Sequence, residues 1–316
     1  MILVCGEALI DLFARTDGSI GAILEARAGG SPLNVASGIA RLGAPTAFLG
    51  SVSTDYFGDL LMRTALSEGI DTSMVKRSPR PTPLVAVTPD ALGHPAYCFY
   101  AHQTAEGDLD LPDIPVQLPA SVGAIAMGSY ALAIEPIGAS LLALAQRERE
   151  RRVISLDPNL RPTMVGPIAQ WRARFDAMAR CAAIVKLSEE DFVGGWGDLS
   201  GAEAVAERYL SQGVRLVIMT RGAAGATAWW SGGGLTLPGR VVPVVDAVGA
   251  GDSFHAGLLA RLAHRRLLDR GALAQLDRTI VQDAVGYAIA AASLTCGRRG
   301  PNLPRRADME AVFGAD

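Results

Sequence analysis

The chain has 316 residues, of which 49% are hydrophobic and 19% charged, and its formal net charge is −3 at pH 7. This composition is that of a compact globular protein and excludes an intrinsically disordered one. The nearly balanced charge gives no basis for nucleic-acid binding. No apolar run approaches a membrane-spanning length, and Glu7 and Asp11 stand where a signal peptide would need basic and then apolar residues. We therefore expect a cytoplasmic protein without a nucleic-acid or membrane partner.

Length and cysteine usage narrow the architecture further. A chain of this length can form one large α/β domain with an appendage, although two small domains remain possible. The four cysteines, at positions 5, 98, 181 and 296, form no Cys-x-x-Cys pair. This spacing suggests neither a zinc site nor a disulfide framework.

The N-terminal segment predicts short strands followed by a helix that begins at a glycine pair. Strands are expected at residues 2–5 and 8–14, with a third at 20–27 pairing with the second. In Gly29-Gly30-Ser31-Pro32, Ser31 is a suitable N-cap and Pro32 suits the first helical position. Asn34 would then face whatever the glycines approach, unless it is an ordinary polar residue on a helix face.

From Pro45 onward, strand and helix patterns alternate. This alternation predicts a mainly parallel sheet covered by helices on both faces, with ligands at the carboxyl ends of the strands. A hairpin, at 83–88 and 96–101 around the turn 89–94, interrupts it and belongs with the N-terminal strands in a small separate sheet. The alternating elements are strands at 46–50, 122–127, 153–156, 183–187 and 216–220, short strands near Thr227 and Leu235, and helices at 55–68, 136–150, 167–180 and 279–295, with a further helix opened by a Ser200–Glu203 capping box.

The stretch 241–262 carries the strongest chemical signal. A β-branched run at 241–245 predicts a strand, and apolar spacing from Phe254 to Leu262 predicts a helix. The turn between them, Gly249-Ala250-Gly251, lets backbone N–H groups converge at the positive end of that helix and predicts an anion cradle. Asp252 follows directly, in a place that suits a general base for an attacking hydroxyl. The alternative is that Asp252 is only a helix N-cap.

These two glycine motifs together resemble the signatures of the ribokinase-like (PfkB) carbohydrate kinases. The resemblance covers essentially the whole chain, and residues 6–11, 128–132 and 157–162 look most like fructokinases. It implies a single kinase domain over 1–316, with a Rossmann-type α/β core and a small β-sheet lid formed by about 8–30 and 83–105.

The resemblance also implies roles for individual residues. Asp252 would be the base, and Gly249, Ala250 and Gly251 the anion hole for the γ-phosphate. The other implied contacts are Asp11, Gly29, Gly30 and Asn34 for the sugar, Thr220, Gly222, Gly225 and Asn302 for the nucleotide, and loop carbonyls near Asp246 and Val248 for K⁺.

Two positions depart from the family pattern. Ala247 stands where the family usually has Thr, which removes a hydroxyl beside the anion hole but spares the backbone cradle. The family's Asn-x-x-Glu motif appears as Lys186-Leu187-Ser188-Glu189. Glu189 can still organise Mg²⁺ through water, whereas Lys186 either meets a phosphate directly or is a solvated strand end.

Three further side chains have open interpretations. Arg161 approaches the sugar or the phosphate, or else forms a surface ion pair. Glu135 is a weaker candidate near the sugar. His255 lies one turn into the helix behind Asp252, where packing in the core is favoured over catalysis.

The leading hypothesis is an ATP-dependent fructokinase that transfers the γ-phosphoryl group to a primary hydroxyl, expected at C6, and that dimerises through its lid. The rivals are a 2-keto-3-deoxygluconate kinase, which Arg161 keeps open, another PfkB sugar or nucleoside kinase, and an inactive sugar or nucleotide sensor, against which the intact Asp252 argues. A Rossmann dehydrogenase would need the full Gly-x-Gly-x-x-Gly. A P-loop NTPase is excluded because both lysines, 76 and 186, follow a valine where that motif demands glycine.

Overall fold

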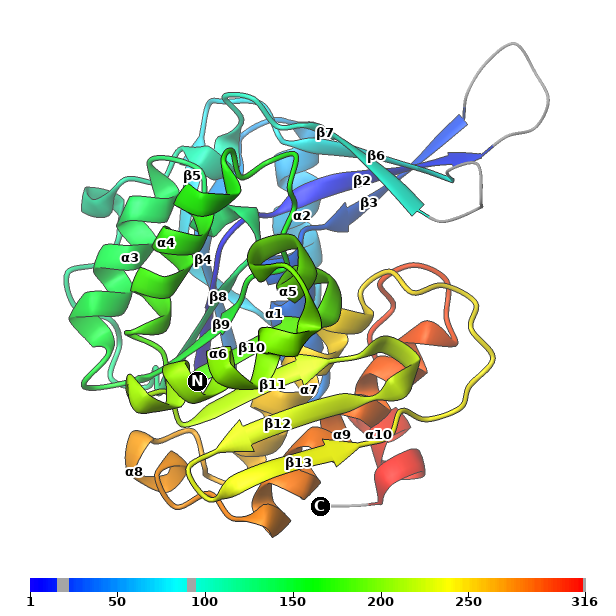
Figure 1. Cartoon of the computed structure of the whole chain (residues 1–316). Coiled ribbons are helices and arrows are strands. Elements are labelled where there is room, and N and C mark those ends of the chain that lie inside the picture. The colour runs from blue at the N-terminus through cyan, green and yellow to red at the C-terminus, as the bar shows by residue number, and fades with distance from the viewer. Residues whose placement is uncertain (16–22, 90–94, 315–316) are drawn as a thin grey trace.

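The computed structural model describes residues 1–15, 23–89 and 95–314, and its body is built on a nine-stranded sheet (Figure 1). Seven strands are parallel, and two antiparallel strands, β12 and β13, complete one edge. The order across the sheet is β13 (Gly233–Leu237), β12 (Ala226–Trp230), β11 (Leu216–Thr220), β10 (Ile184–Ser188), β9 (Val153–Asp157), β8 (Ala124–Gly128), β1 (Ile2–Cys5), β4 (Thr46–Ser53) and β5 (Asp71–Ser78). The predicted mainly parallel α/β core is confirmed.

Helices cover both faces of this sheet and bury a separate apolar core against each. The central strands are near-continuous runs of buried residues, as expected for strands covered on both sides. One face is covered by α1 (Ser31–Arg41), α2 (Tyr56–Ser67), α7 (Ala250–His264), α8 (Arg270–Leu273), α9 (Arg278–Cys296) and α10 (Arg306–Phe313), and the other by α3 (Ile137–Glu148), α4 (Ile168–Ala179), α5 (Glu189–Trp196) and α6 (Ala202–Ser211).

A second sheet of four strands extends from the body, at the upper right of Figure 1. Its order is β3 (Ile23–Gly29), β2 (Leu9–Arg15), β6 (Leu84–Pro89) and β7 (Pro95–Tyr100). The predicted lid sheet is therefore present, and β3 continues to Gly29 rather than ending at Arg27. The first residues of the predicted strand 20–27 and most of the hairpin turn 89–94 lie outside the described residues.

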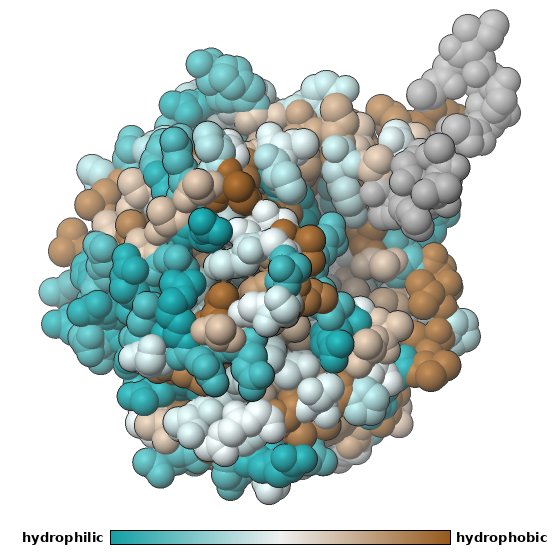
Figure 2. Space-filling view, viewed as in Figure 1, coloured by the Kyte–Doolittle hydropathy of each residue, from teal (hydrophilic) through white to brown (hydrophobic). Residues whose placement is uncertain are grey.

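The predicted strand at 241–245 is wrong, because this segment is an exposed loop between β13 and α7. Val241, Val244 and Val245 are 103%, 69% and 63% exposed, and Figure 2 shows hydrophobic side chains gathered over this loop at its right-hand edge. β-branched residues favour a strand only where a neighbouring strand supplies a ladder. Here the amides of Val245 and Asp246 donate to the carbonyl of Cys296 at the end of α9.

The predicted capping box at Ser200–Glu203 is also wrong. Asp198 accepts a hydrogen bond from the Ser200 amide and caps the 3₁₀ turn Leu199–Gly201, so α6 begins only at Ala202. Short elements absent from the predictions are β5, α5, α8 and α10.

α9 corrects the expectation that no segment approaches a membrane-spanning length. Its 19 residues are long and apolar enough by length and composition, but half of the stretch is buried inside the molecule. It packs along α7 in the apolar core on one face of the sheet, which is the position of a core helix.

Candidate active site

A pocket between the two sheets brings together most of the residues predicted to bind sugar. The lid contributes Val85, Tyr97 and Phe99, and the carboxyl ends of core strands and the starts of two helices supply the polar side chains. The predicted site residues that line it are Asp11, Gly30, Asn34, Arg161, Gly249 and Asp252. Residues separated by more than 200 positions in the chain therefore meet at one pocket.

Asp252 is held by two donors from the first turn of α1. Its Oδ1 accepts from the Ser31 hydroxyl at 2.6 Å, and its Oδ2 accepts from the Asn34 amide at 2.9 Å. Asp252 lies in the first turn of α7, whose N-cap is Gly249 with φ 79°, and no side chain caps that helix. The helix-cap interpretation of Asp252 is therefore wrong.

Ser31 likewise differs from its predicted role. Gly30 is the N-cap of α1, Ser31 is the first helical residue, and no side chain caps this helix either. The hydroxyl of Ser31 donates instead to Asp252, across 221 positions of sequence. A cap pattern cannot reveal such a bond, because the acceptor belongs to a distant helix.

The glycine pair at the start of α1 leaves room for Asp11 and for close approach to the backbone. A Cβ at Gly29 would lie 2.1 Å from Oδ2 of Asp11, and one at Gly30, whose φ is 96°, would lie 2.9 Å from the Glu7 carbonyl. Burial and the neighbouring Asp252 raise the pKa of Asp11 to about 7, with Arg161 acting in the opposite sense.

Arg161 lines this pocket and, among the described residues, does not form the surface ion pair that was the alternative. Its guanidinium lies 5.8 Å from the ring centroid of Tyr97 in β7, and its Nη1 donates to the carbonyl of Leu160 at 3.1 Å. The side chain is thus placed where the lid meets the core, beside the carboxylate of Asp11.

The turn before Asp252 is fixed by the carboxylate of Asp246. Its Oδ1 accepts from the amide of Val248 at 3.0 Å, and its Oδ2 accepts from that of Gly300 at 2.8 Å. A Cβ at Gly249 would lie 2.7 Å from the Pro301 ring, so this position excludes a side chain. The predicted anion cradle is thus a turn tied to the loop before α10, and within it the amide of Ala250 donates to the carbonyl of Ala247 at 3.2 Å.

Lys186 lies beneath this turn and is only 3% exposed, so the solvated-strand-end interpretation is wrong. Its Nζ donates to Oδ2 of Asp157 at 2.7 Å and lies 3.4 Å from the Cβ position of Gly251. Burial opposes the charge, but the carboxylates of Asp157 and Asp191 outweigh it and raise the pKa of Lys186. The first turn of α7 therefore has a buried ammonium group beside it.

The residues predicted to bind the nucleotide lie beyond this turn, at the carboxyl ends of β10 and β11. Thr220 ends β11, and Gly222 opens a short 3₁₀ turn that closes at Gly225, whose φ is 95°. Glu189, the first residue of α5, accepts from Nε of Arg221 at 2.9 Å. Asn302 lies in the loop before α10 and accepts from Arg41 at 3.4 Å.

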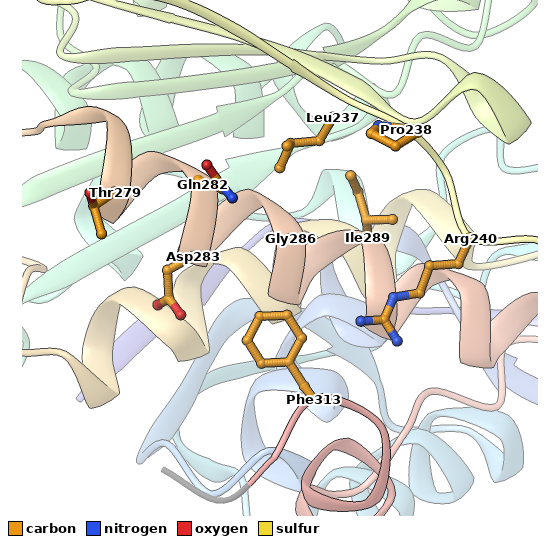
Figure 3. A pocket seen from close by; sticks show the side chains of 9 residues that line it. All are labelled: Leu237, Pro238, Arg240, Thr279, Gln282, Asp283, Gly286, Ile289 and Phe313. Carbon is orange, nitrogen blue, oxygen red and sulfur yellow. The ribbon is translucent and has the colours of Figure 1, made fainter.

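A second pocket, of about 600 Å³, has the end of β13 in its wall (Figure 3). The backbone of Leu237 to Gly239 packs directly against Gly225 and leads into its wall. Figure 3 shows Arg240 and Ile289 at one end of it and Phe313 below. The pocket lies between the end of β13, α9 and α10, and its walls are Leu237, Pro238, Arg240, Thr279, Gln282, Asp283, Gly286, Ile289 and Phe313.

Sequence reasoning missed Glu7 and Tyr130, which also line the pocket between the two sheets. Glu7 is 1% exposed, and burial raises its pKa to about 8. A carboxyl group directly after a buried strand was the available signal.

Conversely, Glu135 is not among the lining residues of this pocket, because it pairs with Arg174 and accepts from the Ala139 amide. His255 is packed in the core as expected.

Comparisons with known proteins agree with this geometry. A model of the pfkB family carbohydrate kinases matches residues 1–308. A fructokinase from Rhizobium leguminosarum bv. trifolii is 38% identical over 318 residues, covering 100% of this chain and 93% of the relative. A fructokinase from Salmonella typhimurium is 33% identical over 319 residues, covering 99% of each chain.

Solved structures share the fold over nearly the full length. Fructokinase from Xylella fastidiosa with bound ATP superposes with a TM-score of 0.88 at 25% identity, covering 98% of this chain and 97% of that one. Fructokinase from Vibrio cholerae O395 in a fructose-, ADP- and calcium-bound form gives 0.82 at 30% identity over 98% and 97%, and its double mutant with fructose, ADP and potassium gives 0.83 over the same shares. The chain therefore belongs to the pfkB family of carbohydrate kinases.

Proposed function

We propose that this carbohydrate kinase is an ATP-dependent fructokinase that phosphorylates the primary hydroxyl at C6. The observation that carries the proposal is the placement of Asp252, which lies between the polar pocket under the lid and the glycine turn. A hydroxyl in the pocket and a phosphate on the turn would both reach this carboxylate. The relatives named as fructokinases support fructose as the acceptor.

The side chains divide the work of such a transfer. The carboxylate of Asp11 would accept hydrogen bonds from sugar hydroxyls, and the amide of Asn34 would donate to them. Gly29 and Gly30 would let the sugar ring approach the backbone. Asp252, oriented by Ser31 and Asn34, would take the proton of the attacking hydroxyl. The amides of the Gly249–Gly251 turn, with the ammonium of Lys186 close by, would stabilise charge on the transferred group.

The charges of the pocket favour a neutral sugar over the 2-keto-3-deoxygluconate alternative. Glu7, Asp11 and Asp252 line the pocket, and the cation among the lining residues is Arg161. A substrate carboxylate would meet the carboxyl groups of Asp11 and Asp252 and one guanidinium already stacked near Tyr97, whereas Glu7, whose pKa burial raises to about 8, would add no charge near pH 7. An uncharged polyol avoids this repulsion.

The nucleotide would extend from the glycine turn along Thr220 to Gly225. We propose the pocket in Figure 3 as the place of its base, since the backbone of its wall residues Leu237 and Pro238 lies against Gly225 and the pocket has apolar walls at Leu237, Ile289 and Phe313. Arg240→Glu should then raise the KM for ATP and leave that for the sugar unchanged. An unaltered KM for ATP would remove this pocket from the nucleotide site.

The side chains near the nucleotide site suit a Mg²⁺ ion that is held mainly by the phosphates of ATP. Among the described residues no cluster of three or more His, Cys, Asp or Glu side chains could hold an ion by itself. Mg²⁺ commonly takes one or two carboxylates together with phosphates and water, and Glu189 would order that water shell. When bound, the metal would neutralise phosphate charge. Glu189→Gln should raise the Mg²⁺ concentration needed for half-maximal rate, and an unchanged titration would remove Glu189 from the site.

K⁺ is the second ion that we propose, bound by loop carbonyls near Asp246 and Val248. The support is the rigid loop that Asp246 creates through two backbone amides and the potassium-bound Vibrio cholerae relative. Replacing sodium with potassium should increase kcat. Equal rates in the two buffers would contradict this site.

The experiment that tests the function is a coupled ADP-release assay with fructose, glucose, ribose, adenosine and 2-keto-3-deoxygluconate as acceptors. Fructose should give the highest kcat/KM, and product analysis should place the phosphate at C6. Preference for 2-keto-3-deoxygluconate would overturn the charge argument. No ADP release with any acceptor, combined with sugar or nucleotide binding, would instead favour the sensor alternative.

A further inference from the structure

A small cavity lies beside Ser31, the residue that donates to Asp252, and apart from Ser31 its walls differ from those of the pocket under the lid. Its volume of about 10 Å³ has room for a single water molecule. Apolar side chains such as Val4, Val35 and Met127 form part of the wall, and three polar side chains, Ser31, Asp157 and His255, complete it. Ser31 also lines the sugar pocket, so it stands between the two spaces.

The carboxylate of Asp157 has an unused acceptor in this region. Its Oδ2 accepts from Lys186 at 2.7 Å, whereas its Oδ1 is buried and has no hydrogen-bond partner in the protein. A buried acceptor without a partner is energetically costly, because it has lost its hydrogen bonds to water. A water molecule in the adjoining cavity would remove that cost.

His255 and Ser31 supply the complementary groups. His255 is 2% exposed with its Nε2 2.8 Å from the Ser155 hydroxyl, and burial lowers its pKa to about 3, which keeps the ring neutral. When Nε2 accepts from Ser155, the ring proton lies on Nδ1 and can be donated. Ser31 gives its only hydroxyl proton to Asp252 and therefore keeps free lone pairs.

We propose that one buried water occupies this cavity, donating to Oδ1 of Asp157 and to Oγ of Ser31 and accepting from Nδ1 of His255. Each donor then has an acceptor, and the water makes the three bonds usual for a buried site. The bonds form a continuous path from Asp252 through Ser31, the water and Asp157 to Lys186 beside Gly251.

Ser31 is accordingly a positioning residue for the base. It fixes one oxygen of Asp252 while the water fixes the serine hydroxyl, so the carboxylate keeps its orientation relative to the anion cradle. This inference rests on the role proposed for Asp252, but the water site itself depends only on the cavity and its polar walls.

A crystal structure of the wild-type protein, at a resolution that shows ordered water, tests the site directly. Density for one water within hydrogen-bond distance of Asp157, Ser31 and His255 is expected. A dry cavity would overturn the proposal, whether or not the protein phosphorylates fructose. Failure of the proposed function would show separately, as absence of turnover with the water in place.

Kinetics test the positioning role. Ser31→Ala should lower kcat by roughly 10- to 100-fold, a loss of the size that misplaced reacting groups produce, with little change in the KM for the sugar. Ser31→Thr, which keeps the hydroxyl, should restore most of the rate. Ser140→Ala is the matched control, because this buried serine bonds the Pro136 carbonyl within α3, away from the site. An equal loss in the alanine and threonine variants would contradict the role of the hydroxyl.

A double-mutant cycle with His255→Leu then tests the connection through water. If the water joins the two side chains, the double variant should lose less activity than the product of the single losses. Fully multiplicative losses would mean that Ser31 and His255 act independently and would defeat the proposed link. Circular dichroism of each variant confirms folding, and the crystallographic test stands if His255→Leu does not fold.

Discussion

The carboxyl groups around the sugar pocket differ in the donors that surround them. Asp252 receives two hydrogen bonds from α1, whereas Glu7 is buried with its Oε2 unpartnered. A base must be oriented toward the hydroxyl that it deprotonates, and donors to both of its oxygens hold the carboxylate of Asp252 in place. Glu7 is instead suited to bind as a neutral carboxylic acid near pH 7, since burial raises its pKa to about 8.

Asp252→Asn tests the base at this scale. The substitution keeps the shape and removes the proton acceptor, so kcat should fall by roughly 10²–10⁴-fold while sugar and ATP still bind. Asp269→Asn is a matched control, because Asp269 is an N-cap of α8 and asparagine caps nearly as well. Near-normal kcat in a folded Asp252→Asn protein would defeat the catalytic assignment.

Glu7 predicts a specific dependence of stability on pH. A folded-state pKa of about 8, against 4.5 for the free side chain, means that the native protein holds the extra proton between these values. The free energy of unfolding contributed by this group therefore falls as the pH rises through that window. Glu7→Gln should stabilise the protein at pH 8 relative to wild type, by an amount on the order of a few kcal/mol, and have little effect at pH 4.5.

Urea unfolding of both proteins at the two pH values measures this difference. The exposed Glu207 provides a control, since Glu207→Gln should shift neither curve appreciably. If Glu7→Gln changed stability equally at pH 4.5 and pH 8, Glu7 would not be the group that titrates.

At the scale of elements, the sequence predicted the regular pieces well and the contacts between them poorly. α9, at Arg278–Cys296, begins and ends within one residue of its predicted limits, whereas α7 begins at Ala250, four residues before the predicted start at Phe254. Val241 to Val245 has the composition of a strand but no neighbouring strand, and composition cannot show that. Ser31 and Lys186 donate to acceptors that lie far away in the chain. Local sequence patterns could therefore suggest only a helix N-cap for Ser31 and a solvated strand end for Lys186.

The candidate site could be predicted where a short motif specifies both a backbone conformation and a chemical group. Gly249 to Asp252 specifies a turn and a helix start, and Gly29 with Gly30 specifies close approach. Gly30, Gly249 and Asp252 line the pocket as expected, whereas Gly29 does not. Glu7 and Tyr130 lie in the segments 6–11 and 128–132, whose resemblance to fructokinases assigned no role to either residue. Their role depends on burial beside the lid, which arises only when the two sheets pack together.

The crossing of α1 and α7 is the contact that sets the donors of Asp252 in place. A Cβ at Gly38 of α1 would lie 2.6 Å from Cβ of Ala256 in α7 and 2.5 Å from Leu303. Gly38→Ala should therefore push the helices apart, lower the free energy of unfolding by about 1–3 kcal/mol and reduce kcat. In Gly286→Ala of α9 the new Cβ would lie 3.6 Å from Phe313, an ordinary contact, and stability should hold or rise. Wild-type kcat in Gly38→Ala would show that this crossing does not set the site.

At the scale of the molecule, the proposed site draws its carboxylates from both sheets of the fold. The lid strand β2 carries Asp11, and the core helix α7 carries Asp252, so the sugar is expected to bind between parts that belong to different sheets. The lid strands β3 and β7 lie at the two edges of their sheet. Ile23, Leu24 and Tyr100 are 56%, 48% and 61% exposed on them.

Unpaired edges with exposed apolar side chains favour association with a second chain, and we predict a homodimer through the lid. Light scattering at micromolar concentration should give twice the mass of 33.0 kDa. Leu24→Lys should shift the mass toward the monomer, because a charged side chain on an edge strand opposes pairing. Leu66, on α2, is also an exposed leucine and provides the control. Leu66→Lys should leave the mass unchanged. A monomeric wild type would refute the dimer, and a dimer that survives Leu24→Lys but not Leu66→Lys would place the interface on the helical face instead of the lid.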